Sequence, residues 1–331
     1  MALRQLKITA ILGIIFTCIV ILLLAERWSG ELQGQKVQAR MQQYIELFRH
    51  IDALTESVAK ERGLTAGYAS TPSPIIKKKV DNQRLQSDSD SEALQKLADE
   101  VQREGTAIPL QVENDLTDLS HLRAIRDDVD NKVMSSAFLR YSTLNQHALD
   151  ASQALSYMIG SASFQSSLTK ILVISELKER YGQLRGKVNG ILSEGAINKE
   201  SRLQLRLYHY QTEYLRKQLE TQLSDHEARQ FKQLTDNKYT QKIDAITEHL
   251  LSSDDLSSLP KPQQWFRMAT AQIENLNPAK TYNWENVMTQ KQIQQPLTYS
   301  AGFIFSMMAL CVLAVMYMIF ALLRARPSSH S

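Results

Sequence analysis

The stretch LFRHIDALTESVAKERGLTAGY, residues 47–68, decides the fold class. Its apolar residues recur every three or four positions, at Leu47, Ile51, Leu54 and Val58. This spacing places them on one face of an α-helix, whereas a strand would alternate every second residue. A later segment has a similar series, made of Leu203, Leu207, Tyr210, Tyr214 and the pair Leu215 and Leu219. The sequence therefore predicts an all-α protein of long helices.

Proline and glycine mark where those helices end. The chain has only 12 Gly and 8 Pro in 331 residues, and no proline lies between Pro109 and Pro260. Because proline is costly inside a helix, this gap permits long helices. Short turns between such helices favour antiparallel bundles. The expected helices end near residues 68 and 103, cover 112–159 and 166–192, form one helix or a broken pair over 199–251, and finish with two short helices.

Two uncharged runs, residues 8–25 and 299–323, frame the chain. About 18 helical residues nearly cross a hydrocarbon core of roughly 30 Å, so both runs are predicted transmembrane helices. Arg4 and Lys7 precede the first run, and arginines follow the second. The excess of positive charge predicts that residues 1–7 and 324–331 are cytoplasmic.

The region between the runs, residues 26–298, is then exported across a bacterial inner (plasma) membrane and is periplasmic or extracellular. A cleaved signal peptide is the alternative for the first run, but small residues do not cluster at a cleavage site near Ala25. The two cysteines, Cys18 and Cys311, lie inside the runs, so the exported region has no disulfide.

Composition and motifs exclude several functional classes. The 38 Lys and Arg residues nearly balance the 35 Asp and Glu residues, so we expect no nucleic-acid partner. The scattered histidines form no spacing typical of a metal site. The sequence contains no glycine-rich phosphate loop, nucleophile elbow or paired-carboxylate motif, so we expect neither catalytic residues nor a cofactor.

Two segments combine an arginine with small residues in a helical context. The first reads KERGLTAGY and has Arg62 directly before Gly63, with a second glycine four residues later. The second reads KERYGQLRGKVNG and has Arg185 before Gly186, with the same spacing. Glycine costs about 1 kcal/mol relative to alanine inside a helix. Repeated glycines therefore indicate that another helix or a ligand approaches the backbone closely.

These segments, in this order and spacing, resemble the nitrate- and nitrite-sensing domain of bacterial membrane receptors. The resemblance covers about residues 49–250. Its motifs are Glu61-Arg62-Gly63 with Tyr68, Gln83-Arg84 with Asp88, Lys178-Glu179 with Gly182 and Arg185-Gly186, and the helix over 205–219 that contains Tyr214-Leu215.

The resemblance implies two stacked four-helix bundles and a sensor that binds nitrate or nitrite near an arginine pair. Carried over to this chain, the pair is Arg62 and Arg185. A planar guanidinium offers a fixed fork of donors that matches a planar anion. Gly63 and Gly186 would let the helices approach around a small ligand. Two carboxylates, Glu61 and Glu179, are expected to hold the arginines in place.

Alternatives to this site remain open at the level of sequence. Leu184 stands where the family often has a glutamate, so Arg180 competes with Arg185 for the site. Arg62 could instead pair with a carboxylate across the bundle, with the glycines serving only helix packing. Tyr181, Tyr208 and the later tyrosines are expected to be core or cap aromatics rather than ligand contacts.

The function expected from these features is that of a membrane sensor. Because few residues follow the second run, we expect it to signal through a cytoplasmic or membrane partner rather than an output domain of its own. A homodimer is plausible by analogy with bundle receptors. One alternative is an exported helical scaffold that binds a partner protein and no anion, which a long exposed apolar stripe would favour. Another is a sensor of a different ligand, such as an amino acid.

Overall fold

The computed structural model describes residues 2–70, 72–118, 121–131, 134–223, 227, 229, 231–232, 236–293 and 299–324. These residues contain helices and no strand, which confirms the all-α prediction. They divide into two compact units. One contains residues 42–293, and the other contains the described residues before position 42 and after position 293.

The smaller unit pairs the two apolar runs. The first lies in α1 (Ala2–Ser70) and the second in α12 (Tyr299–Arg324). Both helices are long and apolar enough to cross a membrane. The rings of Trp28 and Phe305 lie 6.1 Å apart, so the two helices are side by side. Large apolar side chains such as Phe16 and Leu22 are exposed, as expected for surfaces that face lipid.

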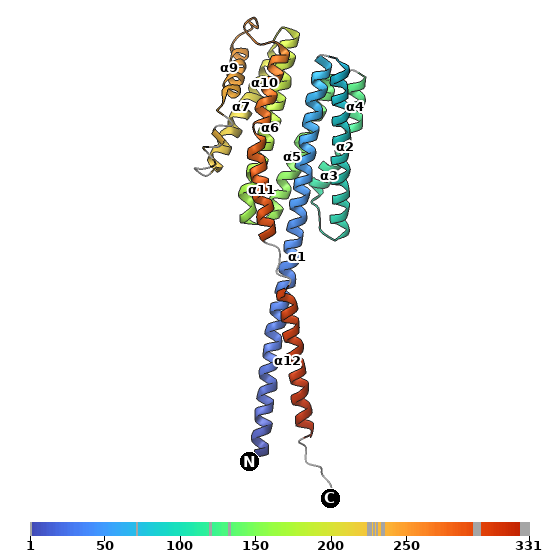
Figure 1. Ribbon diagram of the computed structural model, residues 1–331, viewed down its shortest axis with the longest axis vertical. Helices are drawn as coiled ribbons and strands as arrows, with labels where there is room; N and C mark the ends of the chain where they lie inside the picture. The colour runs from blue at the N-terminus through green and yellow to red at the C-terminus, as the bar shows by residue number, and fades with distance from the viewer. Residues whose placement is uncertain are drawn as a thin grey trace. The chain divides into compact units, whose positions relative to one another are not determined.

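The larger unit contains two groups of helices (Figure 1). The first group comprises the later part of α1 with α2 (Pro74–Arg103), α3 (Leu110–Asp118), α4 (Leu122–Asp130) and α5 (Met134–Ile159). The second comprises α6 (Ala162–Glu194), α7 (Lys199–Gln222), α9 (Lys238–Ser252), α10 (Pro262–Glu274) and α11 (Asn277–Ile293). How the bundles stack stays a prediction from the resemblance.

Local chemistry explains several helix ends. Pro74 opens α2, and the side chain of Ser73 accepts a hydrogen bond from the backbone N–H of Ile76 at 3.2 Å. Gly195 ends α6 with a φ of 69°, a left-handed conformation that glycine adopts without steric cost. Asn198 then caps α7 by accepting from the N–H of Ser201 at 2.8 Å. The predicted turns at these positions are confirmed.

The apolar series that opened the sequence lies in the core. Leu47, Ile51, Leu54 and Val58 are fully buried. In the second group, a continuous cluster of buried residues joins α6, α7, α9 and α10 around Trp265. Burial of this apolar surface is the main force that holds each group together.

The prediction of one helix over residues 112–159 is wrong. The chain forms three helices there, because α3 ends at Asp118, α4 ends at Asp130, and α5 begins at Met134. Asn131 is a turn residue that follows Asp130, and short polar side chains of this kind favour turns over helix interiors.

The apolar series of residues 203–219 is helical, as predicted, but its members lie on different sides of α7. Leu203, Leu207, Tyr210 and Tyr214 are between 54% and 67% exposed. They share one side of the helix, which we call the outer face of α7. The opposite side supplies the core with Leu205, Leu215 and Leu219. Tyr181 is buried, as expected.

Candidate functional site

The two arginine–glycine motifs lie against each other on α1 and α6. A β-carbon built on Gly182 would meet Nη2 of Arg62 at 2.6 Å, and one built on Gly63 would overlap Nη2 of Arg185. Each glycine therefore makes room for the guanidinium of the opposite helix. The physical reason for small residues here is the close approach of a charged side chain to a helix backbone.

Arg62 is almost completely buried and paired with a carboxylate. Its Nη1 and Nη2 donate to the two carboxylate oxygens of Glu179 at 2.5 and 3.0 Å, and both side chains are 1% exposed. Nη1 also donates to the hydroxyl of Ser142 at 2.7 Å. Asn145 and Gln183 donate to the same carboxylate at 2.9 and 3.0 Å. Such a network satisfies the charges that burial would otherwise make costly.

Arg185 is also buried, but its contacts are a hydroxyl group and an aromatic ring. Its Nη1 donates to the hydroxyl of Thr270 at 2.8 Å, and its guanidinium carbon lies 4.6 Å from the centre of the Phe266 ring. Within the described part of the chain it forms no ion pair with a carboxylate. Burial, together with the charge of Arg62, lowers the pKa of the Arg185 guanidinium to about 10. The nearby charges of Glu179 and Glu274 oppose this lowering without outweighing it, so among the described residues this arginine carries a buried charge that forms no ion pair.

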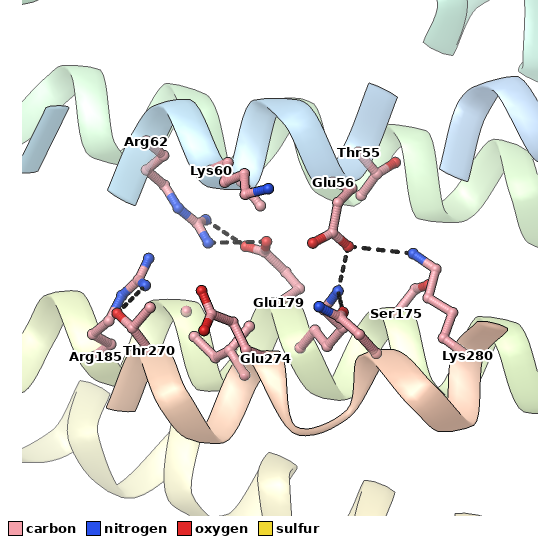
Figure 2. A pocket seen from close by; sticks show the side chains of 15 residues that line it. Thr55, Glu56, Lys60, Arg62, Ser175, Glu179, Arg185, Thr270, Glu274 and Lys280 are labelled. Carbon is pink, nitrogen blue, oxygen red and sulfur yellow. Dashed lines mark hydrogen bonds and ion pairs between the residues drawn. The ribbon is translucent and has the colours of Figure 1, made fainter. Parts of the chain in front are cut away.

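Both arginines line a cavity of about 250 Å³ between α1, α6, α10 and α11 (Figure 2). Its volume is below the ~300–1,000 Å³ of pockets that hold drug-sized ligands, so it suits a small ligand. Figure 2 shows Arg185 and Thr270 at one end, with Arg62 and Glu179 opposite them. The exposed residues Lys60, Glu274 and Asn277 also line the cavity and give it access to solvent.

The other end of the cavity holds a cluster of lysines and carboxylates. Lys178 and Lys280 both contact Glu56, and Lys280 also lies 2.7 Å from Asp52. Burial alone would raise the pKa of the Glu56 carboxyl, but the two lysine charges outweigh it and lower this pKa to about 2. Over the whole cavity, five lysine and arginine side chains of the lining face three lining carboxylates and a fourth, Asp52, which pairs with Lys280. The lining is therefore net positive and favours an anion.

Glu61 does not hold either arginine of the proposed pair. Its carboxylate accepts from Arg126 at 2.8 and 3.0 Å and from the hydroxyl of Tyr141 at 2.7 Å. Burial raises the pKa of the Glu61 carboxyl, but the hydrogen bonds from Arg126 and Tyr141 outweigh this and lower it. Glu61 therefore belongs to a separate charge cluster in the first helix group.

The second family motif joins this same cluster. Arg84 donates to Asp130 at 2.9 and 3.0 Å, and Asp88 accepts from Arg126 at 2.7 Å. No motif in the sequence singles out Arg126. It lies on the short helix α4, which the sequence predicts as part of one longer helix.

The remaining predicted residues take distinct places. Glu179 holds Arg62, as expected of a supporting carboxylate. Gly186 faces Phe138, whose ring would lie 2.5 Å from an added β-carbon, so it serves helix packing rather than the cavity. Arg180 donates to Gln146 at 2.8 Å and is absent from the cavity lining, whereas Arg185 is part of it. The structure thus places Arg185, and not Arg180, beside Arg62.

Three residues near the site carried no sequence signal. Thr270 on α10 and Lys280 on α11 line the cavity, and Phe266 on α10 contacts Arg185 without lining it. Thr270 lies 85 positions from Arg185, and Lys280 lies 224 positions from Glu56. Among the described residues, no group of histidine, cysteine and carboxylate side chains could hold a metal ion.

Comparison with known proteins was consistent with this arrangement. A solved structure described as the NasR transcription antiterminator superposes with a TM-score of 0.71 at 13% identity, and the match covers 90% of this chain and 83% of that one. At this identity the likeness shows a shared fold alone. No curated protein matches the chain. The family model for nitrate and nitrite sensing matches residues 53–290, which include both arginines and the whole cavity lining. The chain therefore belongs to the nitrate- and nitrite-sensing family.

Proposed function

We propose that this chain is a membrane-anchored receptor, not an enzyme, that binds one nitrate or nitrite ion between Arg62 and Arg185. The observation that carries the proposal is the buried side chain of Arg185, which lines a small cavity and forms no ion pair among the described residues. A planar monovalent anion accepts hydrogen bonds from a guanidinium fork and neutralises its charge.

Signal transfer follows from the helix that carries the site. Arg62 and Gly63 lie on α1, and the first apolar run lies on the same helix. A helix shift of about 1–2 Å is the usual scale of such signals. We propose that the anion changes the position of α1 and that a partner protein detects this change. The two apolar helices are compatible with a two-pass membrane protein whose ends are cytoplasmic and whose central domain is exported.

The test is calorimetric titration of the purified full chain in detergent with sodium nitrate and sodium nitrite, at constant ionic strength set with chloride. Arg185→Gln is the informative variant, because Arg185 forms no ion pair in the described structure and its loss leaves the Arg62–Glu179 pair intact. We expect nitrate binding to the parent protein and none to Arg185→Gln, with both melting at similar temperatures. An unchanged affinity in this variant would refute the site.

The outer face of α7 favours a second candidate function, which is self-association of the chain. Four large apolar side chains are exposed there on one side of a helix whose other side is already packed. Such a patch is typical of a protein interface. Mass measurement by light scattering in detergent tests it: Leu207→Glu is expected to convert dimer to monomer. Leu85→Glu, the same change at an exposed leucine on α2, is the control. A monomeric parent protein would exclude this function.

A further inference from the structure

The charges buried at the arginine end of the cavity do not cancel. Arg62 and Glu179 form a two-pronged pair in which each side chain is 1% exposed. Arg185 adds a third charge and forms no ion pair with a carboxylate among the described residues; Glu274, which also lines the cavity, is exposed to solvent. The group of Arg62, Glu179 and Arg185 therefore has a net charge of +1, which one monovalent anion neutralises.

Glu179 is held where it is by more than Arg62. Asn145 on α5 and Gln183 on α6 each donate to one of its oxygens, at 2.9 and 3.0 Å. These two bonds remain if Arg62 turns toward a ligand, so the carboxylate stays beside the cavity in both states. Any anion that binds Arg185 therefore lies close to a fixed negative charge.

We infer that Glu179 is a specificity-determining residue that restricts the site to monovalent anions. The inference rests on the proposed nitrate site. A monovalent anion brings the buried group to neutrality, whereas a divalent anion leaves it with an uncompensated negative charge. An unpaired charge in a buried site is strongly unfavourable, and on the usual scale of this penalty we expect discrimination of about 100-fold or more. Like-charge repulsion is a common way to exclude a wrong ligand.

Perchlorate and sulfate provide the test, because they share a tetrahedral shape and differ in charge. Each anion, and nitrate, is titrated separately by calorimetry into the full chain in detergent at pH 7 and constant ionic strength. We expect heat from nitrate and perchlorate and none from sulfate. Sulfate that binds as tightly as perchlorate would overturn the inference, and so would failure of both tetrahedral anions, because selection would then depend on shape.

The variant Glu179→Gln keeps the size of the side chain and removes its charge. We expect it to bind sulfate and to reduce the preference for perchlorate over sulfate to less than about 10-fold, whatever happens to the absolute affinities. Glu176→Gln is the matched control, because Glu176 lies one turn earlier on α6, is partly exposed and does not line the cavity. It should keep the parent preference. An unchanged preference in Glu179→Gln would overturn the inference.

The design separates this inference from the proposed function. If nitrate gives no heat with the parent protein, the nitrate site fails, while the perchlorate and sulfate titrations still report on Glu179. If nitrate binds and sulfate binds equally well, the nitrate site stands and the role of Glu179 fails. If Glu179→Gln does not fold, the titrations of perchlorate and sulfate into the parent protein still show whether the site excludes divalent anions.

Discussion

Replacing Gly182 with alanine is expected to displace Arg62 from its buried pair. The added β-carbon would lie 2.6 Å from Nη2 of Arg62, about 1 Å short of an ordinary van der Waals contact. Nη2 is the atom that donates to Glu179 at 3.0 Å. The guanidinium is confined by Ser142 and by the ring of Phe138, whose centre lies 5.1 Å away. It therefore yields to the methyl group only by weakening its bond to Glu179.

The magnitude follows from two opposing effects. Loss of a hydrogen bond between charged groups costs about 1.5–3 kcal/mol, and the higher helix propensity of alanine offsets about 1 kcal/mol of this. We expect a net loss of ~0.5–2 kcal/mol in the free energy of unfolding. Gly190, on the same helix, has no atom within 4 Å of an added β-carbon. Gly190→Ala should therefore stabilise the protein by about 1 kcal/mol.

The assay is thermal unfolding of the full chain in detergent, with nitrate titration of each variant. At about 2–4 °C per kcal/mol for a domain of this size, the two alanine variants should melt on the order of 5 °C apart. Gly182→Ala should also bind nitrate more weakly, because the added methyl group lies in the cavity lining against Arg62, whereas Gly190→Ala should bind as the parent does. Equal melting temperatures and equal affinities in the two variants would refute the reasoning.

Trp265→Ala should lower the free energy of unfolding by about 3–5 kcal/mol in urea titrations, since Trp265 is fully buried and its indole N–H donates to the carbonyl of Arg185 at 2.9 Å; a loss below about 1 kcal/mol would contradict the packing. Glu61→Ala should cost about 1.5–3 kcal/mol, because Arg126 loses its two bonds to Glu61 and keeps Asp88 as its carboxylate partner; a variant as stable as the parent would show that this cluster is solvated. The free energy of unfolding should also depend on pH. The folded-state pKa of Glu56, about 2, and that of Glu61 are below the ordinary value of 4.5, so their contribution is complete above pH ~4.5 and is lost as the pH falls below it. Melting temperatures that stay constant between pH 5 and pH 3 would oppose this assignment.

The helices of this protein are largely determined by local sequence. The spacing of Leu47, Ile51, Leu54 and Val58 defines a helix face, and the same residues prove to be fully buried. Capping chemistry at Ser73 and Gly195 fixes helix ends for reasons that involve only neighbouring residues. The division of residues 112–159 into three helices is not evident from the sequence, because single polar residues such as Asn131 only weakly oppose a helix and the surrounding packing decides whether it continues.

The burial of α7 shows a limit of apolar periodicity. The series from Leu203 to Tyr214 and the series through Leu205 and Leu219 both follow helical spacing on one segment. Apolar spacing predicts that a helix has an apolar face, but contacts with other helices determine which face is buried. Only the packing of α7 against the cluster around Trp265 shows that the second series is the inner one.

The site divides in the same way. The two arginine–glycine motifs are visible in the sequence, and the fit of a guanidinium to a planar anion follows from its chemistry. The packing of the helices is needed to show that Glu179 pairs with Arg62, that Glu61 pairs with Arg126, and that Arg185 contacts the hydroxyl of Thr270 and the ring of Phe266. These partners are separated by 65 to 117 positions, so the packing of the helices determines which of them meet. The free energy of a buried charge depends on the groups that surround it. The role of each arginine is therefore a property of the fold rather than of the motif.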